Sequence, residues 1–213
     1  MRLYGYFRSS AAYRVRIALN LKGLACEQVP VNLIKGEQRD AAHLARHPQG
    51  LVPVLETDDG TRLTQSLAIC EYLDERHPAP PLLPADAEGR ARVRALAQLI
   101  ACEIHPLDNL RVLGYLTGEL GIGEDARLAW YRHWIAEGFA ALETQLAGTP
   151  ATRACCHGDT PSLADVCLVP QVFNARRFDC DLGAYPTLER IVAHLETLPA
   201  FAEARPERQP DAA

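Results

Sequence analysis

Apolar and polar positions alternate over the first 77 residues in a way that predicts short strands separated by amphipathic helices. The aromatic stretch LYGYF predicts a strand at 3–7, and apolar residues at helical spacing predict a helix from Ser10 that ends before Gly23. The same reading predicts strands at 26–33, 51–57 and 61–64, a short polar helix at 37–46, and a helix at 66–77 with Ser66 as its N-cap. The order β-α-β-α-β-β-α predicts a small α/β domain with a mixed sheet, over residues 1–80.

A proline-rich stretch, PAPPLLPADA at 78–87, predicts a stiff linker after this domain. Beyond the linker, helical spacing predicts helices at 87–118, 124–147, about 160–176 and 187–196, so residues 87–213 form an all-α domain. A kink is expected at Pro106. The tetrapeptide SLAD at 162–165 predicts a capping box, and RPERQPDAA predicts a loose or surface-laid tail.

Composition is that of an ordinary globular protein, with 48% hydrophobic and 23% charged residues and a net charge of −5. This charge argues against a nucleic-acid partner. No apolar run approaches the roughly 18 residues of a membrane span, and MRLYGYFRSS lacks the features of a secretion signal, so we expect no membrane association. The seven cysteines have no framework spacing, which predicts reduced thiols in the cytoplasm.

Two sets of residues could suggest metal or redox chemistry. His43 and His47 stand four residues apart but have no third ligand nearby, so we expect them on a solvated face. Cys155-Cys156-His157 lacks a second cysteine pair and is weak evidence. We therefore expect no metal site.

The turn FRSSAA at 7–12 stands where the first helix of a thioredoxin-like fold begins. Redox members of that fold carry a Cys-x-x-Cys there, because the helix N-terminus lowers the pKa of a thiol. This chain has no cysteine in the turn. The thiol would therefore come from a bound cofactor, stabilised by the helix dipole and by hydroxyl donors.

Several stretches, in the same order and from Leu3 to about Pro210, carry a more specific resemblance. They are SSAAYRVRIALNLKG, HPQGLVPVLE, QSLAICEYL, IHPLDNLRVL and LADVCLVPQVFNARRF. Together they resemble the zeta class of glutathione transferases. The resemblance implies a thioredoxin-like glutathione-binding domain at 1–80 and an all-helical substrate-binding domain at 87–213.

The resemblance also implies roles for individual residues. Ser9 and Ser10 would donate hydrogen bonds to the glutathione sulfur, although plain N-capping is the alternative, and Ala11 stands where the family has cysteine. Arginines would hold a dicarboxylate substrate, although each alone could be a surface salt-bridge residue: Arg8, Arg111 and Arg177. Residues expected to contact glutathione are Ser10, Gln49, Val52, Pro53, Gln65, Ser66, His105 and Asn109, with a cis peptide bond before Pro53. His105 could also be read as a general base or a structural residue.

The function implied is glutathione-dependent cis–trans isomerisation of maleylacetoacetate to fumarylacetoacetate, by a homodimer. Isomerisation of maleylpyruvate is the first alternative, and conjugation or dehalogenation by a general transferase is the second. Outside enzymes, a non-catalytic glutathione-fold binding subunit remains open, although the serines, Gln65, Ser66 and the arginines together argue against it.

Overall fold

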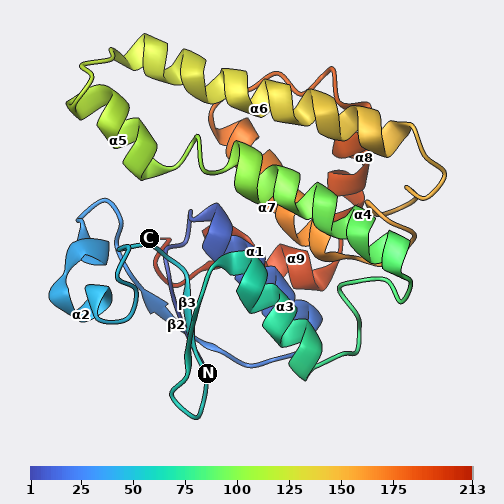
Figure 1. The fold of residues 1–213 in the computed structure, drawn as a ribbon, viewed down its shortest axis with the longest axis horizontal. Coiled ribbons are helices and arrows are strands. Elements are labelled where there is room, and N and C mark those ends of the chain that lie inside the picture. Colours follow the sequence, from blue (N-terminus) through green and yellow to red (C-terminus); the bar gives the residue numbers. More distant parts are fainter. Residues whose placement is uncertain (213) are drawn as a thin grey trace. The chain divides into compact units, whose positions relative to one another are not determined.

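The computed structural model describes residues 1–212, which form two compact units. The first unit contains 1–82 together with the segment from Thr197 onwards, and the second contains Leu83–Glu196. Figure 1 shows the elements of both, and each unit is described by itself.

The first unit is built around a four-stranded mixed sheet in the order β2-β1-β3-β4. β1 pairs parallel with β2 and antiparallel with β3, and β3 pairs antiparallel with β4. The strands are β1 (Arg2–Gly5), β2 (Glu27–Pro30), β3 (Val54–Glu56) and β4 (Arg62–Thr64). The helices are α1 (Ser10–Leu21), α2 (Ala41–Leu44), α3 (Ser66–Arg76) and α9 (Pro199–Ala204), with 3-10 turns at Glu37–Arg39 and Pro206–Arg208.

Both faces of this sheet are covered. α1 and α3 pack side by side (Figure 1), and a Cβ on Gly5 would lie 3.2 Å from the Cβ of Ala12, so the glycine lets α1 approach β1 closely. On the other face Tyr4, Val31 and Val54 form an apolar cluster, and the guanidinium of Arg46 lies 4.5 Å from the centre of the Tyr4 ring. The expected α/β fold of the N-terminal part is confirmed.

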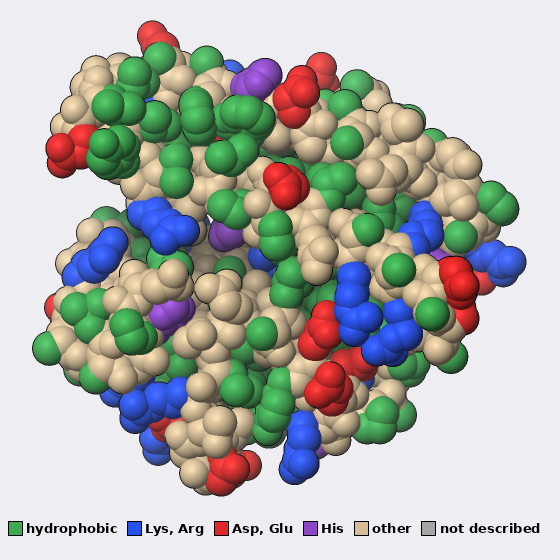
Figure 2. Space-filling model, viewed as in Figure 1, with side chains coloured by type: hydrophobic (Ala, Val, Ile, Leu, Met, Phe, Trp, Pro, Cys, Tyr) green, Lys and Arg blue, Asp and Glu red, His purple; other side chains and the backbone are tan. Residues whose placement is uncertain are grey.

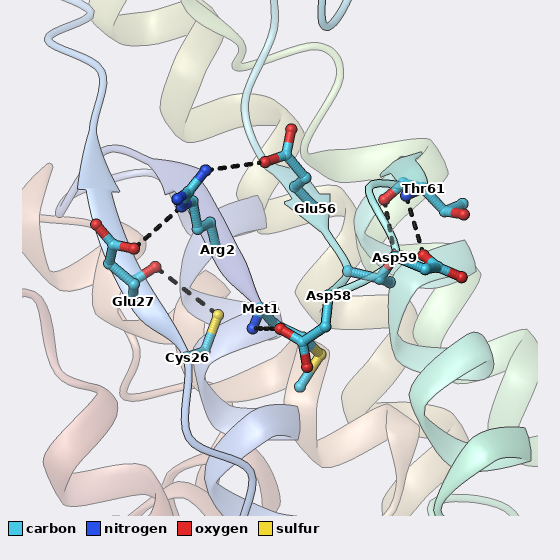
Figure 3. Close-up of polar contacts among 9 residues, drawn as sticks. Met1, Arg2, Cys26, Glu27, Glu56, Asp58, Asp59 and Thr61 are labelled. Carbon is cyan, nitrogen blue, oxygen red and sulfur yellow. Dashed lines mark hydrogen bonds and ion pairs between the residues drawn. The ribbon is translucent and has the colours of Figure 1, made fainter.

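Cross-strand ion pairs fix the register of the sheet (Figure 3). Arg2 on β1 bridges Glu27 on β2 at 3.1 Å and Glu56 on β3 at 3.3 Å, and Arg62 on β4 pairs with Glu56 at 3.0 Å. Opposite charges directly across neighbouring strands favour this pairing over a slipped one.

The C-terminal segment packs on α1, whereas the sequence grouped it with the helical half. Phe201 is fully buried, and the side chain of Asn20 donates a hydrogen bond to the carbonyl of Ala200 at 2.9 Å. α9 has only six residues, too few to show a helical period in the sequence, which is why it was not expected.

The second unit is all helical. Its helices are α4 (Ala87–Gln98), α5 (Leu110–Gly118), α6 (Glu124–Ala147), α7 (Leu163–Arg177) and α8 (Pro186–Leu195), with a π-helical turn at Leu99–Ile104. The helical stretch expected over 87–118 is interrupted where the kink was expected, but by a full break: the chain leaves the helix around Pro106, after the π-helical turn, and restarts at Leu110. The capping box is confirmed: Asp165 accepts hydrogen bonds from the backbone and the hydroxyl of Ser162, at 2.8 and 2.6 Å.

The helices differ in how much apolar surface they bury. α7 is the core helix of the unit and packs against α4 and α8. α5 instead leaves Leu110 and Tyr115 more than half exposed, and Figure 2 shows hydrophobic side chains gathered over α5 and the neighbouring part of α6. Among residues 1–212, no helix is both long and apolar enough to cross a membrane.

Candidate active site

Strand register brings three predicted site segments to one edge of the sheet. The chain leaves β1 into the turn at 7–10, enters β3 from Val52–Pro53, and leaves β4 into Gln65–Ser66. Because β1 and β4 both run antiparallel to β3, the end of β1, the start of β3 and the end of β4 lie together. The predicted site residues of the first unit therefore lie close together, at the end of the sheet where β1 and β4 finish and β3 begins.

The serine turn begins α1. Ser9 is the N-cap, and its Oγ accepts a hydrogen bond from the Ala12 N–H at 3.2 Å, while Ser10 is buried as the first helical residue. The N-capping alternative therefore holds for Ser9. A capping hydroxyl that accepts from the backbone still has its own proton to donate outward. The turn combines hydroxyl donors with the positive end of a twelve-residue helix, which suits an anion.

Arg8 extends from the same turn. Its Nη2 donates a hydrogen bond to the Tyr6 hydroxyl at 3.0 Å, and its guanidinium lies 4.9 Å from the centre of the Phe7 ring. These contacts hold the guanidinium against the aromatic side chains of Tyr6 and Phe7.

A buried histidine, His43, contacts the backbone of the loop that precedes β3. The Val52–Pro53 peptide bond is cis, as expected. Nε2 of His43 lies 2.8 Å from the carbonyl oxygen of Leu51, the residue before Val52. The expectation that His43 and His47 lie on a solvated face is wrong, because their side chains are only 3% and 4% exposed. Burial lowers the pKa of His47, and the neighbouring His43 lowers it further. His43 thus positions the cis-proline loop.

Over the described chain, no group of three His, Cys, Asp or Glu side chains could hold a metal ion.

The start of α3 forms the second polar corner of the site. Gln65 precedes the helix with a φ of 68°, and its side-chain amide lies 3.5 Å from Oε1 of Gln49, so these two predicted residues are brought together. Ser66 is not the N-cap that the sequence suggested but the first residue of α3, and Gln65, with its positive φ, occupies the cap position.

Arg14 contacts Ser66, and the sequence did not indicate that this arginine belongs to the site. Its Nη1 donates to Ser66 Oγ at 3.2 Å, whereas its Nε and Nη2 are buried without a hydrogen-bond partner in the part of the chain that the structure describes. Because no carboxylate among residues 1–212 is hydrogen-bonded to it, this buried guanidinium adds positive charge at this corner. It also leaves the hydroxyl proton of Ser66 directed elsewhere.

Three of the four predicted residues of the second unit lie around the break between the π-helical turn and α5, and the fourth lies at the end of α7. His105 ends the π-helical turn, and Asn109 caps α5, its Oδ1 accepting from the Arg111 N–H at 3.1 Å. Arg111 is exposed in the first turn of α5. Arg177 ends α7, its guanidinium 4.7 Å from the centre of the Phe178 ring. Whether these four contact a ligand stays a prediction.

A buried carboxyl in the same break was also missed. Asp108 is 7% exposed, and neither of its oxygens has a hydrogen-bond partner among residues 1–212. Burial raises the pKa of Asp108 to about 8, so the carboxyl is protonated at neutral pH. No local sequence pattern distinguishes this aspartate from the solvated ones, since its burial comes from tertiary packing.

Known proteins account for this arrangement. A family model described as the N-terminal domain of glutathione S-transferase matches residues 3–81. The probable maleylacetoacetate isomerase of Vibrio cholerae is 55% identical over 212 residues, covering 99% of this chain and 97% of the relative. The holo structure of a maleylpyruvate isomerase, described as a bacterial zeta-class transferase, is 49% identical with a TM-score of 0.97 and full coverage of both chains. The chain belongs to the zeta class of glutathione S-transferases.

A further similar structure was solved with two small molecules bound. Maleylacetoacetate isomerase from Methylobacterium extorquens AM1, solved with bound malonate and glutathione, has a TM-score of 0.97 and 45% identity, with full coverage of both chains. The resemblance read from SSAAYRVRIALNLKG and the later stretches is thereby confirmed, as is the glutathione transferase architecture. Ala11 remains this chain's departure at the serine turn.

Proposed function

We propose that the protein is a glutathione-dependent cis–trans isomerase that converts maleylacetoacetate to fumarylacetoacetate. The observation that carries the proposal is a helix-start turn with two serines but no thiol of its own, set at one sheet edge beside the cis Val52–Pro53 bond and Gln65–Ser66. Such a site can stabilise a thiolate, but the thiol must come from a bound cofactor such as glutathione.

The polar groups of the first unit fit glutathione. Ser66 and the first backbone N–H groups of α3 offer donors to a carboxylate, reinforced by the charge of Arg14. The backbone before Pro53 can pair with a peptide group. The serine turn lies at the same sheet edge and offers donors to a sulfur. Gln49 would approach the far end of the tripeptide.

When bound, glutathione supplies a thiol that can add to the cis double bond of a maleyl substrate and leave after rotation about the resulting single bond. The chain's own part is electrostatic. Ser9 and Ser10 donate to the sulfur, and the N-terminus of α1 favours its negative charge, so the thiol loses its proton near neutral pH. Arg8, Arg111 and Arg177 are proposed to hold the substrate carboxylates and the negative charge that develops on its carbonyl oxygen.

Maleylpyruvate is the second candidate substrate. The 49% identical neighbour with a TM-score of 0.97 is a maleylpyruvate isomerase, and maleylpyruvate presents the same cis double bond between acidic groups. Turnover of each compound separates the two readings. A homodimer in the cytoplasm completes the proposal; its cytoplasmic part is supported by the odd number of cysteines, seven, and by their lack of a disulfide-framework spacing.

The experiment that tests the thiol-activation step is a pH titration of bound glutathione by thiolate absorbance, in the wild type and in Ser9→Ala, Ser10→Ala and the double variant. Loss of one donor should raise the thiol pKa by about one to two units, since a charge-assisted hydrogen bond contributes roughly 1.5–3 kcal/mol and one pKa unit corresponds to about 1.4 kcal/mol. Thr160→Ala, a hydroxyl loss just before the capping box, is the matched control. An unchanged thiol pKa in the double variant would remove the serines from the mechanism.

A further inference from the structure

Both backbone polar groups of Phe7 are held by side chains. Its N–H donates to Oδ2 of Asp211 at 3.0 Å, and its carbonyl oxygen accepts from Nη2 of Arg16 at 2.9 Å. Phe7 lies just beyond the end of β1, where no neighbouring strand supplies partners, and it immediately precedes Arg8 and Ser9. The backbone entering the serine turn is therefore anchored by residues 9 and 204 positions away.

Arg16 links this anchor to the C-terminal segment. It is 4% exposed, and its Nε donates to the carbonyl of Ala204, the last residue of α9, at 3.0 Å. Burial lowers the pKa of Arg16 to about 10, which leaves it protonated at neutral pH, and the carboxylate of Asp211 favours its charged form. One guanidinium thus ties α1, the turn and α9 together.

Of the two alternatives for RPERQPDAA, a loose or a surface-laid tail, the structure shows the second: the segment that carries Asp211 follows a defined path held by hydrogen bonds. Pro206 is buried, and the side-chain amide of Gln209 donates to the carbonyls of Arg205 at 2.9 Å and Glu203 at 3.1 Å. These contacts fold the chain back after α9 and bring Asp211, which is half-buried, to the N–H of Phe7.

We propose that Asp211 is a positioning residue of the active site, which acts through Phe7 to hold Arg8, Ser9 and Ser10 in their working geometry. The inference rests on the proposed function. A displacement of about 1 Å in a catalytic group can reduce a rate by roughly 100-fold. A turn fixed by charge-assisted hydrogen bonds at its entry is protected from such displacement. Asp211 touches neither substrate nor glutathione in this account.

The test compares Asp211→Ala, Asp211→Asn and Asp211→Glu with Glu207→Gln, which removes an exposed carboxylate from the same segment. In Asp211→Ala we expect turnover per bound glutathione to fall about 10-fold and the bound thiol pKa to rise, with the glutathione Kd within about three-fold of wild type, since the tripeptide is held mainly by the other segments. Asp211→Asn keeps an acceptor and should lie between, Asp211→Glu should recover part of the loss, and Glu207→Gln should behave as wild type.

A second readout needs neither substrate nor glutathione. Amide hydrogen exchange of Phe7 in the ligand-free protein should accelerate at least about ten-fold in Asp211→Ala and not in Glu207→Gln. Unchanged exchange at Phe7, or an unchanged thiol pKa and turnover per site, overturns the inference. If the wild type binds no glutathione, the proposed function fails, and exchange at Phe7 still decides whether Asp211 holds the turn.

Discussion

Replacing Arg14 by methionine should separate glutathione binding from stability. Arg14 is 1% exposed and makes one side-chain hydrogen bond, to Ser66 Oγ at 3.2 Å, within the part of the chain that the structure describes. Methionine has a similar length, no charge and no unsatisfied donor. The substitution therefore removes a buried cation without opening a large cavity.

The substitution has two effects of opposite sign on the free energy of unfolding. Each buried unsatisfied donor costs about 1–3 kcal/mol, and Arg14 has two such nitrogens, whereas the lost hydrogen bond to Ser66 is worth about 1.5–3 kcal/mol. The unfolding free energy should therefore stay the same or rise by up to a few kcal/mol. Glutathione affinity should fall about 10- to 100-fold, because the charge and the oriented hydroxyl at the start of α3 are both lost.

The assay is thermal unfolding without glutathione together with calorimetric titration of glutathione. Arg76→Met, which removes an exposed positive charge from the last turn of α3, is the control and should leave both unchanged. In a double-mutant cycle, Ser66→Ala should cost less affinity in the Arg14→Met background than alone. A Kd within two-fold of wild type, or a loss of more than about 3 kcal/mol in stability, would refute this reasoning.

Three further results are expected. Asp108→Asn mimics the protonated acid, so its stability advantage over wild type should grow between pH 4 and pH 8, by up to about 1.4 kcal/mol per pH unit, and then level off, because unfolded aspartate ionises near pH 3.8 and the native carboxyl only near 8; parallel Tm curves would contradict this. Lys22→Met should cost about 3–5 kcal/mol in urea unfolding, because the fully buried ammonium pairs with Asp74 at 2.6 Å; a loss under about 1 kcal/mol would show that the pair is dispensable. Arg177→Ala should raise the substrate KM at least about ten-fold, whereas Arg176→Ala, which breaks surface pairs with Glu189 and Glu196, should change it little; equal effects would argue against a substrate role for Arg177.

Much of the fold could be predicted because its signals are local. The end of α1 follows from Gly23, and the SLAD box marks the start of α7. The predicted strand at 3–7, followed by a helical pattern from Ser10, placed the serine turn at the start of the first helix. These features depend on residues within one turn or one strand of each other.

The errors concern residues whose environment is set by distant segments. His43 and His47 were expected on a solvated face, yet both are buried, and His43 contacts the Leu51 carbonyl in the loop before β3. Ser66 was expected to be the N-cap of α3, yet Gln65, with a positive φ, occupies the cap position one residue earlier. Asp211 lies in a polar tail, and its bond spans 204 positions, so no pattern in the sequence could reveal it. Tertiary packing overrides local propensity at each of these sites.

The measurement that tests the central claim most directly is the conversion of maleylacetoacetate, or its analogue maleylacetone, to the trans isomer by the purified protein, with and without glutathione. We predict fast turnover that depends strictly on glutathione, with maleylpyruvate assayed in parallel to rank the substrates. No conversion of any of these cis compounds in the presence of glutathione would contradict the account.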